Sequence, residues 1–307
     1  MTNCIIYICL SLSSKKGEDD MNSQNNSLKP YQSRRSALSQ YAFLPGFSYQ
    51  LRFLATQLAE EENWKYDDMT IPEKMKEEEK EVLRNYTVLY QYIHYTFSKA
   101  LKESRIVESD DGSFSIMNTG LLAKSTGEEI FMLFKKNEKL DAKQKMILGG
   151  FYKESSRDIP ETLRGKLPDH IDYFENCPED SYFNTRLDIQ TSAEHIVIDN
   201  FERLPTSLQS IGDTRTIVDI VNGLIATAKK RILRNNRLVV PHYYNGKIQY
   251  LAPLVFGKDT FVLVLEKNDQ SYRANTILTV GMAYCDARLI TKPESAWLVL
   301  EPNQTKK

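Results

Sequence analysis

The sequence predicts an α+β protein in which antiparallel strands pack against helices. The composition is the first indication, because 41% hydrophobic and 26% charged residues among 307 suit a chain that buries a sizeable core. The second is the spacing of apolar residues, which is helical first, then strand-like, and then alternates between the two. The third is that turn-forming Gly, Asp, Asn and Ser residues separate the strand-like runs.

The first ordered elements are predicted to be helices. Apolar residues recur at helical spacing over 51–58, and Ser48 is a suitable N-cap for this helix. One long helix is predicted over 71–101, because Pro72 lies in its first turn, acidic residues fill its first half and apolar residues follow. This long N-terminal helical segment is part of the predicted fold.

Strand-like and helical patterns alternate after this segment. Four antiparallel strands are predicted at 104–108, 114–122, 129–135 and 145–153. Helices are then predicted at 191–200 and 214–235. The last elements are predicted to be strands at 247–255, 259–266 and 271–274, a helix at 275–290 and a closing strand at 297–300. No internal repeat is visible in the sequence.

The predicted domain organisation has three parts. Residues 1–20 are interpreted as an untranslated-leader artefact, because the codons of residues 15–18 can contain a purine-rich ribosome-binding sequence at a suitable distance before Met21. A genuine disordered leader is the alternative. Residues 21–40 are rich in Asn, Ser and Gln and are predicted to form a disordered polar tail. Residues 41–303 are predicted to form a single large α+β domain.

Charge and cysteine content favour a cytoplasmic protein. Lys and Arg number 40 against 41 Asp and Glu, which gives a net charge of −1. Because the chain has no overall excess of positive charge, any nucleic-acid binding must depend on a local group of cations. Four cysteines are too few for a disulfide framework in a chain of this length. No apolar run approaches the ~20 residues of a membrane-spanning helix, so no membrane partner is expected.

Common catalytic and cofactor motifs do not occur in the sequence. It contains no phosphate-binding loop, no dinucleotide-binding glycine motif, no nucleophile elbow and no H-E-x-x-H motif. The four histidines stand singly, which disfavours a histidine-rich zinc site. We therefore expect neither a metal ion nor a cofactor.

The densest group of chemically active side chains lies between residues 194 and 205. On a helix, His195 and Asp199 share a face, so Asp199 is a candidate for orienting His195 in acid–base catalysis while Arg203 binds an anion. The alternative is a structural role, in which the histidine bonds to the backbone and Arg203 forms an ion pair. The sequence favours neither interpretation.

Polar residues inside a predicted strand form a second candidate. Asn118 and Thr119 precede Gly120, a residue that weakens a strand unless a bulge or a close backbone approach requires it. Their side chains are candidates for binding a sugar or a base. The alternative is that they bond locally within the bulge.

Two further candidates lie in the second half. Cations over 229–237 precede tyrosines over 243–250, a combination that fits phosphates and stacked bases, although cations also suit a helix C-terminus. Tyr272 and Arg288 flank the predicted helix near the C-terminus. Small residues in that helix are interpreted as permitting close packing against the sheet.

Several short motifs together resemble those of a known family. They are Leu54-Ala55, 83–86, 118–121, Leu167-Pro168, 195–205, 251–254 and 282–289. The resemblance is to a bacterial and fungal family with a domain of unknown function, whose members are sometimes fused to cold-shock or other RNA-binding modules. It implies one large domain, while the family's association with RNA comes from those neighbouring modules. Position 286 is Asp where the family pattern leads us to expect Asn.

We expect the protein to bind RNA or a nucleotide-like ligand in a polar cleft between sheet and helices. The expected lining is Asn118, Thr119, His195, Arg203, Tyr272 and Arg288, with the two arginines on phosphates and a tyrosine on a base. One alternative is a metal-independent phosphodiesterase or nucleotide hydrolase with His195 as general base. The other is a protein-interaction module that uses the helix at 71–101 as its partner face. Whether the protein is an enzyme stays open.

Overall fold

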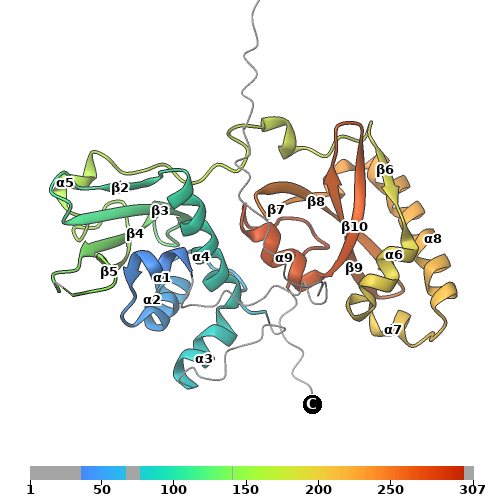
Figure 1. Cartoon of the computed structure of the whole chain (residues 1–307), viewed down its shortest axis with the longest axis horizontal. Coiled ribbons are helices and arrows are strands. Elements are labelled where there is room, and N and C mark those ends of the chain that lie inside the picture. Colours follow the sequence, from blue (N-terminus) through green and yellow to red (C-terminus); the bar gives the residue numbers. More distant parts are fainter. Residues whose placement is uncertain (1–35, 67–76, 140, 301–307) are drawn as a thin grey trace, which may run out of the picture.

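Two five-stranded sheets with helices packed on them make up the structure (Figure 1). It is a computed structural model that describes residues 36–66, 77–139 and 141–300. The first sheet lies with α1–α5 on the left of Figure 1, and the second lies with α6–α9 on the right. The predicted α+β class is confirmed.

The first half begins inside the region predicted to be a polar tail. The elements there are α1 (Ala37–Tyr41), β1 (Ala42–Phe43), α2 (Phe47–Phe53) and a π-helical turn (Leu54–Leu58). The Ser36 hydroxyl caps α1 by accepting the N–H of Ser39, and Leu38 is fully buried. Residues 36–40 therefore belong to the folded part. The leader predicted over 1–20 and the tail up to residue 35 lie outside the described residues.

Two helices occupy the described part of the segment predicted as one helix over 71–101. They are α3 (Glu77–Asn85) and α4 (Thr87–Lys102). Tyr86 separates them, because its φ of −131° and ψ of 34° are not helical. The N–H of Val88 bonds to the carbonyl oxygen of Trp64 at 2.9 Å instead of to its own helix. The prediction of a single long helix was wrong. The helical spacing of apolar residues continues past Tyr86, but the hydrogen bond from Val88 to Trp64 stabilises a break in the helix at that residue. Residues 71–76 lie outside the described part.

The first sheet has the strand order β1-β5-β4-β3-β2. Its further strands, which confirm the four predicted ones, are β2 (Ile106–Glu108), β3 (Phe114–Leu122), β4 (Glu129–Lys136) and β5 (Met146–Lys153). They form an antiparallel meander, and β1 pairs with β5 in parallel. The β3–β4 register shifts between Asn118 and Leu121, so Gly120 lies in the predicted bulge. The short helix α5 (Glu161–Arg164) follows.

The second sheet has the strand order β6-β10-β9-β8-β7. Its strands are β6 (Asp188–Thr191), β7 (Val240–Tyr244), β8 (Lys247–Phe256), β9 (Asp259–Lys267) and β10 (Ser271–Thr279). Its helices are α6 (Ala193–Asp199), α7 (Thr206–Gln209), α8 (Thr214–Arg234) and α9 (Val280–Arg288).

Two predictions near the C-terminus were wrong. The helix predicted at 275–290 begins only at Val280, because residues 275–279 extend β10, where β-branched Thr276 and Ile277 favour a strand. The closing strand predicted at 297–300 is absent from the described chain. The N–H of Leu298 instead bonds to the carbonyl oxygen of Ser295, which closes a turn.

The two sheets share one topology. In each half a first strand is followed by helices and then by a four-stranded antiparallel meander, whose last strand pairs in parallel with the first. The helices α4 and α8 hold the same place, immediately before the meander. The sequence shows no repeat, so only the order and direction of the strands reveal that the fold is built twice.

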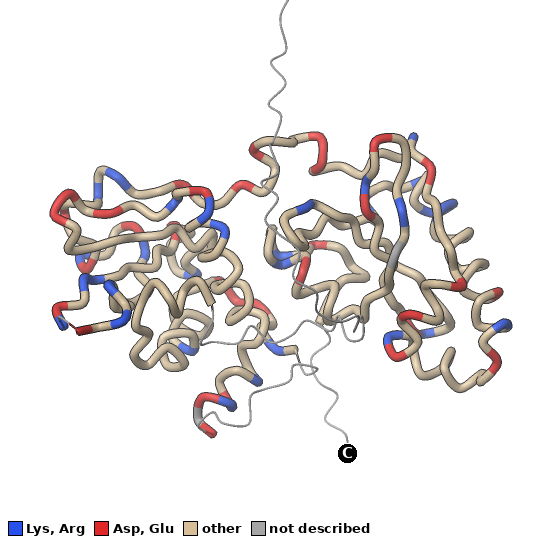
Figure 2. Tube along the Cα trace, viewed as in Figure 1, with Lys and Arg blue, Asp and Glu red and all other residues tan. Residues whose placement is uncertain are grey.

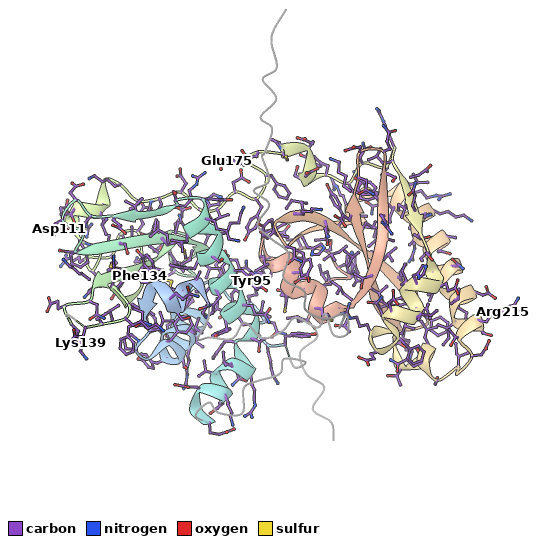
Figure 3. All side chains as sticks on the ribbon, in the orientation of Figure 1. Tyr95, Asp111, Phe134, Lys139, Glu175 and Arg215 are labelled. Atoms are coloured by element: carbon purple, nitrogen blue, oxygen red, sulfur yellow. The ribbon has the colours of Figure 1, made fainter. Side chains whose placement is uncertain are left out.

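The largest apolar core joins the two halves. It contains residues of α4, of α9 and of both sheets. A second core lies between the other face of the second sheet and α6 and α8, and a small third core includes residues of β3, β4 and α5. We call the contact between α4, α9 and residues 59–66 the seam; side chains fill this region in Figure 3, where Tyr95 on α4 is labelled. The single domain predicted over 41–303 stays a prediction.

The helix at 71–101, predicted as the partner face of an interaction module, lies in part at the seam. Eleven residues of α4 are buried, so most apolar side chains in the described part of the predicted helix at 71–101 lie inside the protein, although Leu101 is exposed. Within the described ranges, none of the helices combines the length and apolar composition needed to cross a membrane.

Candidate functional site

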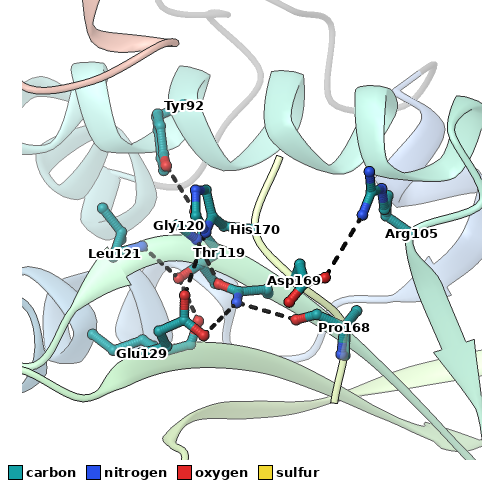
Figure 4. Close-up of polar contacts among 11 residues, drawn as sticks. Tyr92, Arg105, Thr119, Gly120, Leu121, Glu129, Pro168, Asp169 and His170 are labelled. Carbon is teal, nitrogen blue, oxygen red and sulfur yellow. Dashed lines mark hydrogen bonds and ion pairs between the residues drawn. The ribbon is translucent and has the colours of Figure 1, made fainter. Parts of the chain in front are cut away.

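Asn118 and Thr119 lie at the β3 bulge and are buried. The Asn118 amide donates to Glu129 Oε2 (3.0 Å) and to the carbonyl oxygen of Pro168 (3.2 Å), and its oxygen accepts the N–H of Gly120 (2.9 Å) (Figure 4). The Thr119 hydroxyl donates to a carbonyl oxygen of β4 at 2.6 Å. Most of these bonds are the local bonding within a bulge that the sequence left open as the alternative, whereas the bond to Pro168 joins the bulge to a distant segment.

The bulge positions a histidine–carboxylate pair that the sequence analysis did not identify. His170 Nδ1 lies 3.4 Å from Glu129 Oε1, and the His170 side chain is exposed (Figure 4). Its neighbour Asp169 lies 4.0 Å from Arg105. Because Asn118 holds the other oxygen of Glu129, the carboxylate fixes the direction of the imidazole. Residues 168–170 are far from β4 in the sequence, and only the fold brings the two together.

His195 and Asp199 lie on α6 and are both exposed. Although they are one helical turn apart as predicted, no hydrogen bond or ion pair joins them in the described structure. The structure therefore gives no support to Asp199 as the group that orients His195, and this role stays a prediction.

Arg203 is half-buried beside α6 and β10. Its Nη1 donates to Asn200 Oδ1 (3.1 Å), to Thr276 Oγ1 (3.1 Å) and to the carbonyl oxygen of Ile277 (3.2 Å). Burial lowers the pKa of the guanidinium. These three bonds fasten the segment after α6 to the end of β10, so Nη1 has a structural role, and a phosphate contact of Arg203 stays a prediction.

Tyr272 is fully buried in the second core. Its ring stacks on Phe183 with the centroids 4.2 Å apart, and its hydroxyl accepts the N–H of Asn184 at 2.8 Å. The side chain is therefore enclosed by protein on its face and at its hydroxyl. The expectation that Tyr272 stacks on a base was wrong, because its position in β10 points it toward the core.

Arg288 lies at the seam, where it is buried. Its Nε donates to both carboxylate oxygens of Glu62, each at 2.8 Å. The guanidinium lies over two aromatic rings, with Cζ 4.5 Å from the Tyr92 centroid and 5.0 Å from that of Trp64. The Tyr284 hydroxyl donates to Glu62 Oε1 at 2.8 Å. Arg288 thus links α9 to the segment before α3.

The structure does not gather the predicted side chains in one pocket. Asn118 and Thr119 lie in the first sheet, His195 and Asp199 on the surface of α6, Tyr272 in the second core and Arg288 at the seam. Tyr92 links two of these places indirectly. Arg288 lies over the Tyr92 ring, and the Tyr92 hydroxyl donates to the carbonyl oxygen of Thr119 at 2.7 Å.

A second buried pair of titratable groups lies between β7 and α9. His242 Nδ1 is 3.7 Å from Asp286 Oδ2, and both side chains are almost fully buried. Burial raises the pKa of Asp286 to about 8, although the charge of Arg203 opposes this shift. Burial also lowers the pKa of His242 to about 3. Near neutral pH both groups are therefore mainly uncharged, as their apolar surroundings require.

Asp286→Asn is expected to increase the free energy of unfolding at pH 8, because it removes a carboxyl that the folded state must keep protonated. Between the ordinary pKa of 3.8 and the folded value of about 8, the unfolded chain releases this proton and the folded protein retains it. The carboxyl therefore weakens the fold increasingly as the pH rises through this window. Urea unfolding at pH 5, 6.5 and 8 measures the gain, which should grow with pH; a gain that is equal at all three values would contradict it.

Exposed cations lie on the last turns of α8 and on the 3-10 turn that follows it (Asn236–Leu238). Lys230, Arg231, Arg234 and Arg237 are exposed, and none forms an ion pair with a carboxylate of the described chain. Blue segments mark Lys and Arg on this part of the helix in Figure 2, at the end opposite to Arg215, which Figure 3 labels. We call these four residues the basic end of α8. Among the described residues, no cluster of three His, Cys, Asp or Glu side chains is suited to a metal ion.

The fold and these sites define a two-sheet α+β protein with its polar clusters at the bulge, the seam and the basic end of α8. A family model described as "Domain of unknown function (DUF3825)" matches residues 55–297. The chain therefore belongs to the DUF3825 family. No curated protein and no solved structure is similar enough to this chain to count as a match.

Proposed function

We propose that the protein binds RNA through the basic end of α8. The observation that carries the proposal is that its four exposed cations have no carboxylate partner among the described residues. Three of them, Lys230, Arg231 and Arg234, fall within an arc of about 100° on the helix. Unpaired cations on one face of a helix attract a phosphate backbone and release its counterions.

RNA is named rather than another polyanion because of the family resemblance described in the sequence analysis. Exposed Leu233, between these cations, adds an apolar contact for a base. The hydrolase alternative with His195 as general base receives no support, since nothing in the described chain orients its ring.

The proposal is tested with the triple variant Lys230→Glu, Arg231→Glu and Arg234→Glu. We expect a labelled single-stranded RNA of ~20 nucleotides to bind the full chain at least about tenfold more weakly after this change, measured by fluorescence anisotropy. The slope of log K against log salt should also become smaller, by about 0.7 for each phosphate that the variant no longer neutralises.

A matched control is Lys136→Glu, Lys139→Glu and Lys143→Glu, at the end of β4 and in the loop that follows it. These lysines are equally exposed and lie in the other half, where Figure 3 labels Lys139. The control changes net charge by the same amount and should leave most of the affinity. Equal losses in the two triple variants would show that only net charge matters and would overturn the assignment to α8.

A further inference from the structure

Three exposed aromatic side chains lie close together in the chain, on β1 and α2. Phe43, Tyr49 and Phe53 are 53%, 74% and 40% exposed, and they are three of the five exposed aromatic side chains in the described ranges. Tyr49 and Phe53 are one helical turn apart on α2, and Arg52 falls within the same arc of about 100°. Leu51, on the opposite side of the helix, is buried in the largest core. The outer side of α2 is therefore aromatic and cationic.

The end of β4 and the loop that follows it bring lysines to the same edge of the first sheet. β1 is the edge strand, and Phe43 pairs with Ile147 of β5, which pairs in turn with Lys135 of β4. Side chains of directly paired residues lie on the same face of a sheet. The Gln144 amide also donates to the carbonyl oxygen of Ser39 at 3.2 Å, so the loop lies against the segment that leads into β1.

This edge has a local excess of positive charge, although the whole chain is nearly neutral. Residues 36–59 contain no Asp or Glu, and only Glu138 and Asp141 lie among the lysines of 135–145. Blue segments mark lysines of this loop at the lower left of Figure 2, where Figure 3 labels Lys139. The exposed cations, none of which forms an ion pair within the part of the chain that the structure describes, are Arg52, Lys135, Lys136, Lys139, Lys143 and Lys145. We call these six cations, together with Phe43, Tyr49 and Phe53, the aromatic–basic face.

Aromatic side chains surrounded by cations fit the surface of an anionic lipid bilayer. Phe and Tyr rings are stable at the level of the headgroups, and Lys and Arg side chains beside them are attracted by anionic lipids. RNA also binds aromatic rings and cations, but there arginine is preferred, because its planar guanidinium recognises phosphates and stacks on bases. Three of the four cations at the basic end of α8 are arginines, whereas five of the six on the aromatic–basic face are lysines. The composition of this face therefore favours lipid headgroups over RNA.

We propose that the aromatic–basic face docks on anionic lipid bilayers. The rings of Phe43, Tyr49 and Phe53 enter the headgroup region, and the lysines lie beside the anionic headgroups. Such a contact stays at the surface of the bilayer and needs no membrane-spanning helix, so it differs from the sequence-based expectation of no membrane partner. It is independent of the proposed RNA binding, because the basic end of α8 lies in the other half of the protein.

The first test measures cosedimentation of the full chain with phosphatidylcholine vesicles that contain about 30% phosphatidylserine. We expect binding at least about tenfold stronger than to vesicles of phosphatidylcholine alone, and weaker binding at high salt. The triple variant to Glu at Lys136, Lys139 and Lys143 should weaken binding by at least about tenfold. The triple variant of α8 changes the net charge equally and should keep most of the binding. Equal losses in the two variants, or equal binding to both kinds of vesicle, would overturn the inference.

The same two triple variants separate this inference from the proposed function. The α8 variant should lose RNA affinity and keep vesicle binding, and the variant at Lys136, Lys139 and Lys143 should do the reverse. If the wild-type chain binds RNA as proposed but no vesicles, only the inference is wrong. If it binds vesicles as expected but no RNA, only the proposed function is wrong. A loss of RNA affinity instead of vesicle binding in the variant at Lys136, Lys139 and Lys143 would assign the aromatic–basic face to RNA and overturn lipid docking.

The second test places a fluorescent probe on the aromatic–basic face. Tyr49→Trp is compared with Tyr182→Trp in the other half, because the two tyrosines are similarly exposed, 74% and 72%. On phosphatidylserine vesicles we expect the emission of Tyr49→Trp to shift to shorter wavelength and to be quenched by brominated lipids. The emission of Tyr182→Trp should stay unchanged, and the two native tryptophans are common to both variants. An equal shift in the two variants, or no shift in Tyr49→Trp, would contradict insertion of this face.

Discussion

Replacing Arg288 by Met is expected to lower the free energy of unfolding by about 3–5 kcal/mol, because it leaves the buried Glu62 carboxylate without its cation. The Arg288 and Glu62 side chains are only 7% and 4% exposed, so water cannot replace the lost partner. The variant also loses the stacking of the guanidinium on the Tyr92 and Trp64 rings. Equilibrium unfolding in urea measures the change.

Two further variants separate the ion pair from general damage to the seam. The double variant Glu62→Leu and Arg288→Met should recover most of the loss, because it leaves no buried charge unpaired. Arg105→Met breaks an ion pair with Glu175 (2.6 Å) that is more exposed, and should cost much less than Arg288→Met. Equal losses for Arg288→Met and Arg105→Met would show that burial of the Arg288–Glu62 pair does not make it more important than an exposed pair.

Gly120→Ala is expected to destabilise the protein by about 3–4 kcal/mol through two separate effects. The φ of Gly120 is +70°, a backbone conformation that strains an alanine. A Cβ at this position would also lie 2.8 Å from the Tyr92 hydroxyl oxygen. Tyr92 cannot move away easily, since it is buried and bonds to Thr119.

Gly127→Ala is the matched control for this substitution. Gly127 has nearly the same φ, +67°, and nothing lies within 4 Å of the position of an added Cβ. Only the backbone strain of about 1–2 kcal/mol should therefore remain. Adding Tyr92→Phe to Gly120→Ala removes the close approach and should recover part of the loss. Similar losses at Gly120 and Gly127, measured by urea unfolding, would show that the proximity of Tyr92 is unimportant.

Local patterns predicted those elements whose limits depend on nearby residues. The meander strands β2–β5 and the long helix α8 follow from apolar spacing and turn residues. The break at Tyr86 could not be predicted in this way, because it depends on a hydrogen bond from Val88 to the distant Trp64. The two parallel edge strands were missed for the same reason, since short segments show their pairing only in the folded chain.

The candidate sites show the same limit. The bulge at Gly120 was predictable, since a glycine inside a strand usually marks a bulge or a close approach of the backbone. The partner of Arg288 was not, because Glu62 lies in a segment with many glutamates and no pattern distinguishes it. From the sequence, Tyr272 was expected to contact a ligand. The alternation of side chains along a strand does not tell which face of β10 packs against the core, so the burial of Tyr272 could not be predicted.

The repeated topology has a consequence for how the chain is completed during synthesis. In each half the first strand leaves the ribosome long before the last strand of its meander, as the pairs Ala42 with Met146 and Asp188 with Ser271 show. Each half must therefore wait for its final strand before the earliest one has an edge to join. During synthesis, each of the two sheets therefore passes through a stage in which an edge strand is unpaired. An unpaired edge strand can pair with another chain, so the nascent protein is prone to aggregation at both stages.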